Sequence, residues 1–122
     1  MTHISSTTAH ALKAANFPQP KIRVNQCWYS GHRFFQINDT ASPLFIYERS
    51  NELPDWLAFA PTAEDILREL PPRFCIFFLK EQNQFVCEHQ DSYGRSIAQY
   101  RASSSAEAAA LAYLSLNPPT AP

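Results

Sequence analysis

The stretch Phe74-Cys75-Ile76-Phe77-Phe78-Leu79 decides the fold. Side chains alternate between the two faces of a β-strand, and in this stretch both alternating sets are apolar. Such a strand is typical of the centre of a sheet whose two faces are both covered. We therefore predict a central strand over 74–79 that is covered by helices or by a partner subunit.

Two capped helices flank the predicted strands of this half of the chain. Thr62-Ala63-Glu64-Asp65 and Ser104-Ser105-Ala106-Glu107 both have the order of a capping box. Pro71-Pro72 ends the first helix, and Asn117-Pro118-Pro119 ends the second, which is rich in alanine. The apolar positions share one face of each predicted helix, namely Ala63, Ile66, Leu67 and Leu70 in the first and Ala106, Ala109, Ala110, Tyr113 and Leu114 in the second.

Two more strands follow the decisive stretch. Glu81-Gln82-Asn83 predicts a turn into a strand over 84–90. Asp91-Ser92-Tyr93-Gly94 predicts a second turn, which leads into a shorter strand over 96–100. The second half of the chain is therefore predicted to be a three-stranded antiparallel meander.

The first helix of the chain is predicted near the N-terminus. Ser5 or Ser6 can cap it, and it is expected to run to about Ala15. Phe17-Pro18-Gln19-Pro20 ends it, because proline cannot continue the hydrogen-bond ladder of a helix. So small a helix is marginal alone and is expected to dock on the rest of the protein.

A first meander is predicted between this helix and the second one. The alternation over 21–29 predicts a strand, and Ser30-Gly31 predicts a hairpin turn into a second strand over 32–37. The run 44–47, Leu-Phe-Ile-Tyr, predicts the third strand. The stretch 51–61, which contains two prolines, predicts an irregular connection pinned by its aromatic side chains.

The predicted order of elements is α-β-β-β-α-β-β-β-α, an α+β fold of two three-stranded antiparallel meanders with three helices. A chain of 122 residues is long enough to bury one core, so we predict a single domain over 1–117. Residues 118–122 are predicted to be a disordered tail.

Composition excludes several classes of function. The net charge of −1 gives no field that would attract a polyanion, which disfavours nucleic-acid binding. No apolar run approaches the roughly 20 residues that cross a bilayer, and residues 1–16 lack the apolar core of a secretory signal. The three cysteines have no CxxC pairing, so we expect reduced thiols in the cytoplasm. Because the chain has two glycines, it has no Gly-rich phosphate loop, and no cofactor is predicted.

Cys87 and His89 form the one candidate pair for catalysis or metal binding. They are two residues apart on a predicted strand, so both side chains point to one face. This arrangement is compatible with a thiolate–imidazole pair or with two metal ligands, but it does not require either. Zinc needs further ligands that Cys27 and Cys75 are not spaced to supply, so no metal site is predicted and a buried thiol is the alternative interpretation.

Aromatic and arginine side chains gather at the two predicted hairpins. Arginine can pair with a phosphate while an aromatic ring stacks on a base, so such clusters could grip a nucleotide-like anion. The alternative is ordinary hairpin ends, with rings packed on arginine stems. The candidate ligand-binding residues are Trp28, Tyr29, Arg33, Tyr93, Arg95, Tyr100 and Arg101.

Parts of the sequence also resemble a group of known proteins. The segment Phe17-Pro18-Gln19-Pro20, followed by Gln26-Cys27-Trp28-Tyr29, resembles the opening of small uncharacterised proteins encoded by phages and prophages of gut bacteria. The string 59–67, Phe-Ala-Pro-Thr-Ala-Glu-Asp-Ile-Leu, and an Ala-rich closing helix that begins near Ala106 are similar too. The resemblance implies a mobile-element origin in a bacterial host and assigns no catalytic residue.

Two classes of function fit these observations. The first is a non-catalytic phage accessory protein that binds and neutralises a host component, either a defence protein or a small nucleotide signal. The second is a small hydrolase or transferase that uses Cys87 and His89. A homo-oligomer is also expected, because Phe77 and Leu79 need more cover than three modest helices supply and a small sheet leaves unpaired edges.

Overall fold

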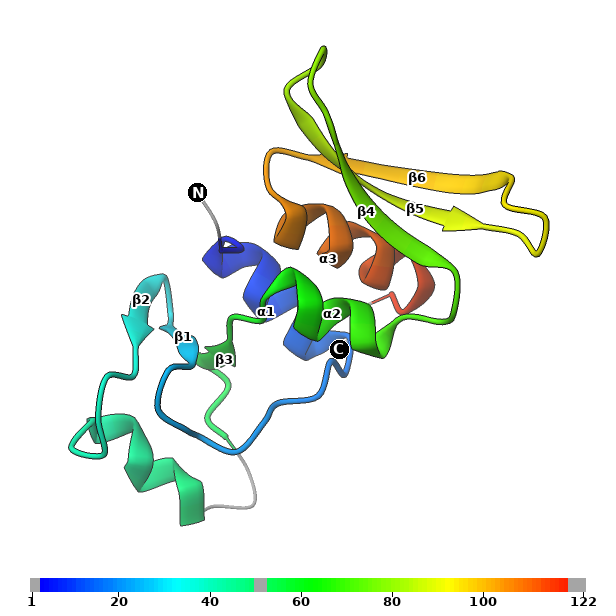
Figure 1. Ribbon diagram of the computed structural model, residues 1–122. Helices are drawn as coiled ribbons and strands as arrows, with labels where there is room; N and C mark the ends of the chain where they lie inside the picture. Colours follow the sequence, from blue (N-terminus) through cyan, green and yellow to red (C-terminus); the bar gives the residue numbers. More distant parts are fainter. Residues whose placement is uncertain (1–2, 50–52, 119–122) are drawn as a thin grey trace.

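The computed structural model describes residues 3–49 and 53–118 (Figure 1). The α-helices lie together between two antiparallel sheets, each with three described strands. This arrangement confirms the predicted α+β class and its α-β-β-β-α-β-β-β-α order. Of the predicted C-terminal tail, 118–122, residues 119–122 lie outside the described part of the chain.

Ten elements follow one another along the described part of the chain. They are α1 (Ser6–Ala14), β1 (Cys27–Ser30), β2 (Arg33–Gln36), the 3₁₀ helix η1 (Pro43–Arg49), β3 (Leu57–Phe59), α2 (Ala63–Glu69), β4 (Phe74–Leu79), β5 (Gln84–Gln90), β6 (Ser96–Ala102) and α3 (Ser105–Leu116). Ser5 caps α1, and Thr62 with Asp65 closes the predicted capping box of α2.

The first sheet has the strand order β2-β1-β3, so β1 lies at its centre and the sheet is not a simple meander. The run 44–47, predicted as the third strand, lies instead in η1. The N–H of Phe45 donates to the carbonyl of Ser42, so the turn before Pro43 continues as helical turns. The third strand comes from the stretch predicted to be irregular, where Leu57, Ala58 and Phe59 are all buried.

The first strand is also shorter than predicted. Residues 21–26 do not belong to it, because Asn25 has a positive φ of 74°, which no regular strand residue adopts. The N–H of Asn25 donates to the carbonyl of Ile37, and the Gln26 carbonyl accepts from the N–H of Ile37. The alternation of 21–25 therefore ends in a turn, and regular pairing begins at Cys27.

The second sheet is a simple meander with the order β4-β5-β6. The prediction of a central strand over 74–79 is wrong in its position, because β4 is an edge and β5 is the centre. One face of this sheet packs on α3 (Figure 1). The other face has no described element upon it. Phe78 lies on the α3 side of β4, opposite Phe85, and is still 46% exposed.

Candidate functional site

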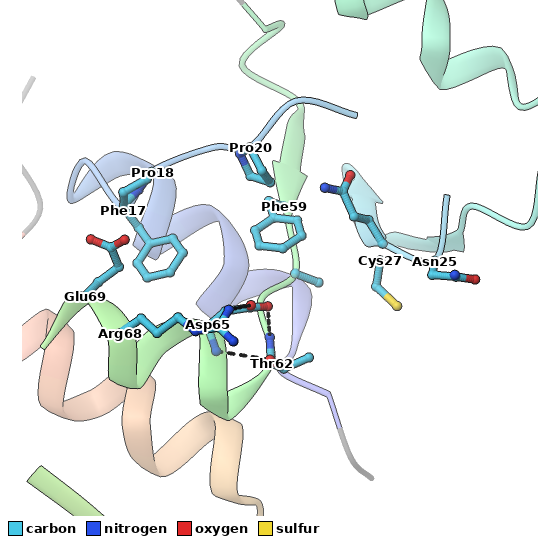
Figure 2. Close-up of a pocket in the computed structure, with 12 residues that line it drawn as sticks. Phe17, Pro18, Pro20, Asn25, Cys27, Phe59, Thr62, Asp65, Arg68 and Glu69 are labelled. Atoms are coloured by element: carbon cyan, nitrogen blue, oxygen red, sulfur yellow. Dashed lines mark hydrogen bonds and ion pairs between the residues drawn. The ribbon is translucent and has the colours of Figure 1, made fainter. Parts of the chain in front are cut away.

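A surface cavity of about 330 Å³ lies between the segment 17–20, the first sheet and α2 (Figure 2). Figure 2 shows Phe17, Pro18 and Pro20 on one side, with the ring of Phe59 beside them. These apolar side chains give the cavity its walls. The polar side chains around it are Asn25, Gln26, Thr62, Asp65, Arg68 and Glu69, together with the Cys27 thiol.

The polar groups of this cavity are largely used by the protein itself. The Thr62 hydroxyl accepts from the N–H of Asp65 at 3.1 Å, and the Asp65 carboxylate accepts from the N–H of Thr62 at 2.9 Å. Arg68 lies 2.8 Å from a carboxylate oxygen of Glu64 and 3.6 Å from one of Asp65. Burial raises the pKa of the Cys27 thiol, so it is a poor nucleophile. The cavity therefore offers an apolar surface edged by charged side chains, of which Asp65 and Arg68 already have partners within the protein.

Cys87 and His89 do share one face of β5, as predicted, but that face packs on α3. Burial raises the pKa of the Cys87 thiol to about 11, and the nearby Cys75 thiol adds to the effect. The His89 ring stacks on Phe74, with 4.2 Å between ring centroids. Cys87 has no exposed surface, and its raised pKa disfavours the thiolate that a nucleophile requires, so the structure gives no support to the catalytic pair.

The candidate ligand-binding residues of the first hairpin belong mainly to the core. Trp28 has no exposed surface, and its indole N–H donates to the Gln26 side chain. Tyr29 is 6% exposed, and its hydroxyl donates to the carbonyl of Ile4 at 2.7 Å. Arg33 is exposed and lies over the Phe35 ring. Neither Trp28 nor Tyr29 presents a ring on which a base could stack.

The candidate residues of the second hairpin point in different directions. Tyr93 is 82% exposed and carries the Arg95 guanidinium over its ring, while Arg95 also pairs with Asp91 at 2.9 Å. Tyr100 packs against the core, and its hydroxyl donates to Ser115. Arg101 faces away from α3. The structure therefore brings Tyr93 and Arg95 together but separates them from the rest, and the helices lie between the two hairpins (Figure 1).

The side of the second sheet opposite α3, which we call the open face, has no described element packed upon it (Figure 1). Strand register gives its rows, because directly opposed residues point to the same side. Phe77, Val86 and Arg101 form one row, and Cys75, Glu88 and Gln99 form the next. The residues of the open face are Cys75, Phe77, Leu79, Gln84, Val86, Glu88, Gln90, Gln99 and Arg101.

Glu88 organises the polar half of the open face. Its carboxylate accepts hydrogen bonds of 2.7 Å from the side-chain amides of both Gln90 and Gln99. These bonds, first from Gln90 and then from Gln99, hold the pKa of Glu88 below its usual value against the opposing effect of burial. Beside this network, the half-buried Phe77 and Leu79 make an apolar strip, while Val86, opposite Phe77, has no exposed surface.

Sequence reasoning did not select the open face, although its signal is present. Residues 84–90 alternate between two sets, and Gln84, Val86, Glu88 and Gln90 fall on one side. That mixed side is the one left uncovered. The apolar side, with Phe85 and Cys87, packs on α3.

No protein-family model, curated protein or solved structure matches this chain. Within residues 3–49 and 53–118 there is no helix with the length and apolar character needed to cross a membrane. The same described ranges contain no cluster of three or more His, Cys, Asp or Glu side chains that could hold a metal ion.

Proposed function

We propose that the protein is a non-catalytic binding protein that captures a partner protein on its open face. One observation carries this proposal: an apolar strip of the half-buried Phe77 and Leu79 lies beside the Glu88 network and the Arg101 cation. Protein interfaces have this composition, with an apolar centre inside a polar rim that supplies hydrogen bonds and charge.

The resemblance to phage and prophage proteins supports a more specific version of this function. In that version the protein is a mobile-element accessory protein that acts in the cytoplasm of a bacterial host. It binds a component of the host's defence and removes it from action. Binding is sufficient for such a role, which agrees with a Cys87 thiol that is buried and protonated.

A protein partner is favoured over a nucleotide. A nucleotide site needs a stacking ring and a cation that converge on one ligand. Trp28 and Tyr29 are buried, and Arg95 is occupied by Asp91 and by the Tyr93 ring. The open face instead presents an apolar strip beside a hydrogen-bonding network, which suits another protein.

The function is tested by a matched pair of charge reversals. Arg101 lies on the open face, whereas Arg33 is an exposed strand arginine on the other sheet. Bacteria that carry defined defence systems would express the wild type, Arg101→Glu or Arg33→Glu, and phage plating would be counted. We expect the wild type and Arg33→Glu to raise plating and Arg101→Glu to lose the effect, with all three proteins equally folded.

Two results would contradict this function. Equal activity of Arg101→Glu and the wild type would remove the open face from the mechanism. Calorimetric titration with cyclic and linear nucleotides tests the alternative ligand, and we expect no heat of binding. A saturable heat that is lost in Tyr93→Ala would instead support capture of a nucleotide signal.

We also propose that the protein self-associates, as the sequence analysis expects. The observation that supports this is the position of β4, an apolar strand at the edge of its sheet. Light scattering at micromolar concentration tests it, and a mass near the monomer value of 13.9 kDa would contradict it.

A further inference from the structure

Among residues 3–49 and 53–118, no strand pairs with the outer edge of β4, and its sequence has none of the features that usually protect a sheet edge. Edge strands are usually short, charged, bulged or interrupted by proline, because their free backbone groups can pair with another chain. The six residues Phe74–Leu79 contain no charge, no proline and no glycine, and their pairing with β5 is regular from Phe74 to Leu79. An unpaired segment of this kind is prone to aggregate unless another strand covers it.

The other described edges are protected. β6 has a bulge opposite Gln90 and carries Arg101. In the first sheet, β2 has four residues and β3 has three. Both are too short to offer a long template for pairing. The contrast singles out β4 as the edge that pairs.

We propose that β4 pairs antiparallel with β4 of a second copy of this chain, so that two sheets join into one of six strands. This inference rests on the self-association proposed above and gives it a location and a register. A two-fold axis relates the copies, as in most homodimers. Opposed residues of an antiparallel pair point to the same face, so the axis must pass beside a residue that opposes itself. Near the middle of β4 that residue is Ile76 or Phe77.

The charges that flank β4 select Phe77. When Phe77 opposes its own copy, Arg73 of each chain lies opposite Glu81 of the other, which gives two symmetric ion pairs. When Ile76 opposes its own copy, Arg73 lies opposite Leu79 and gains no charged partner. Arg73 and Glu81 are both exposed and lie just outside β4, Arg73 with a positive φ of 75° before Phe74 and Glu81 in the turn after Leu79, so their long side chains meet at the ends of the paired strands.

The paired arrangement also enlarges the open face. Three strands of this length span a flat area of roughly 340 Å², from the spacing of strands and the rise per residue. A typical interface buries about 800 Å² on each partner. Joining two copies through β4 makes the two open faces continuous, because the two-fold axis keeps α3 of both copies on the same side of the sheet. A dimer therefore presents an area close to that of a typical binding surface.

Charge reversal at the flanks tests the register. Arg73→Glu places two glutamates opposite each other at both ends of the interface, and Glu81→Arg does the same with arginines. We expect each single variant to dimerise about tenfold more weakly than the wild type in sedimentation experiments. An equal mixture of the two variants should recover the heterodimer, because glutamate at 73 then faces arginine at 81 and Glu81 faces Arg73. Recovery also shows that both variants are folded.

Disulfide trapping supplies a second readout. In a Cys75→Ser background, Phe77→Cys places two thiols opposite each other, and the opposed Cα atoms of an antiparallel pair are about 4.5–5.5 Å apart, within disulfide range. We expect mild oxidation to give a covalent dimer with Phe77→Cys and not with Ile76→Cys. Cross-linking of Ile76→Cys alone would overturn the register.

The outcomes separate this inference from the proposed function. Single charge variants that dimerise like the wild type, or a mixture that fails to recover, would overturn pairing through β4 even if light scattering shows a dimer. Arg101 lies on β6, away from the β4 edge, so Arg101→Glu should remain dimeric while losing plating activity. Loss of activity in Arg101→Glu with no dimer in the wild type would sink the inference and leave the function standing.

Discussion

Glu88 lies on the open face, and only 9% of its surface is exposed. The hydrogen bonds to its carboxylate come from neutral side chains. The charge is held by neutral donors, the side-chain amides of Gln90 and Gln99 at 2.7 Å each. Hydrogen bonds to a charged group stabilise more than bonds between neutral groups. Glu88 therefore fixes three side chains of the open face in one arrangement before any partner binds.

This network predicts a specific dependence of stability on pH. Because the pKa of Glu88 in the folded protein lies below its ordinary value of 4.5, its contribution is complete above that value. The contribution is lost as the pH falls through the folded pKa. We expect Glu88→Gln to lower the free energy of unfolding by about 1 kcal/mol at neutral pH, and by less in acid.

Urea unfolding of both proteins at neutral and acidic pH checks this expectation. Glu69→Gln removes one exposed carboxylate from the end of α2, away from both the open face and the β4 edge, and serves as the control for net charge. The difference in free energy of unfolding between the wild type and Glu88→Gln should shrink as the pH falls below about 4. A constant difference would show that the hydrogen bonds do not depend on the ionised form of Glu88.

At the scale of elements, Glu107 joins two helices. The sequence predicts a capping box in which Glu107 folds back on Ser104, and half of it is present: the Ser104 hydroxyl accepts from the N–H of Glu107. The carboxylate instead accepts from the N–H of Ser5 at 2.6 Å and from the Thr8 hydroxyl at 2.9 Å. Ser5 is the N-cap of α1, so a residue of α3 supplies the carboxylate that a capping box within α1 would need.

We expect Glu107→Ala to destabilise the protein by about 2 kcal/mol, because two hydrogen bonds to a charged group are lost and the N-terminus of α1 loses a carboxylate. Glu64→Ala is the matched control, since it removes an exposed carboxylate that pairs with Arg68 and should cost at most about 0.5 kcal/mol. Thermal unfolding of both variants measures the difference. Equal costs would mean that the link between α1 and α3 contributes nothing.

Elements set by local signals were predictable, and those set by distant partners were not. Proline stops, caps and turns placed the three helices and the β4-β5-β6 hairpins, because these signals act within a few residues. β3 was not predicted, because its three residues show no alternation and form a strand only by pairing with β1. The edge position of β4 was not predicted for the same reason, since the sequence of an apolar strand does not indicate which strands will pair with it.

The same limit applies to the candidate site. Alternation along β5 separates the residues of the open face from those under α3, so the composition of that face could be predicted. The burial of Trp28 and Tyr29 could not be predicted. The sequence around them does not show that Trp28 bonds to Gln26 and Tyr29 to Ile4.

For the whole molecule, one core connects the two sheets. The buried cluster extends from Trp28 in the first sheet, through Leu12 of α1 and Ile66 of α2, to Cys87 in the second. Figure 1 shows the helices between the sheets, and α3 packs on α1, on α2 and on the second sheet. The two sheets do not pack directly on each other in this view, so any coupling between them passes through the helices.

Because the helices belong to both halves of the core, we expect the sheets to unfold together, as in a single two-state domain. The two tryptophans report on the first sheet by fluorescence, and Cys87 reports on the second by its access to an alkylating reagent in a Cys27→Ser, Cys75→Ser background. The urea midpoints of the two probes should coincide. Leu12→Ala removes a fully buried side chain of α1 at a cost of about 2–5 kcal/mol, and it should lower both midpoints equally. If Leu12→Ala lowers the urea midpoint seen by fluorescence but not the midpoint seen by Cys87 alkylation, the chain unfolds as two units. That result would contradict the single domain predicted over 1–117.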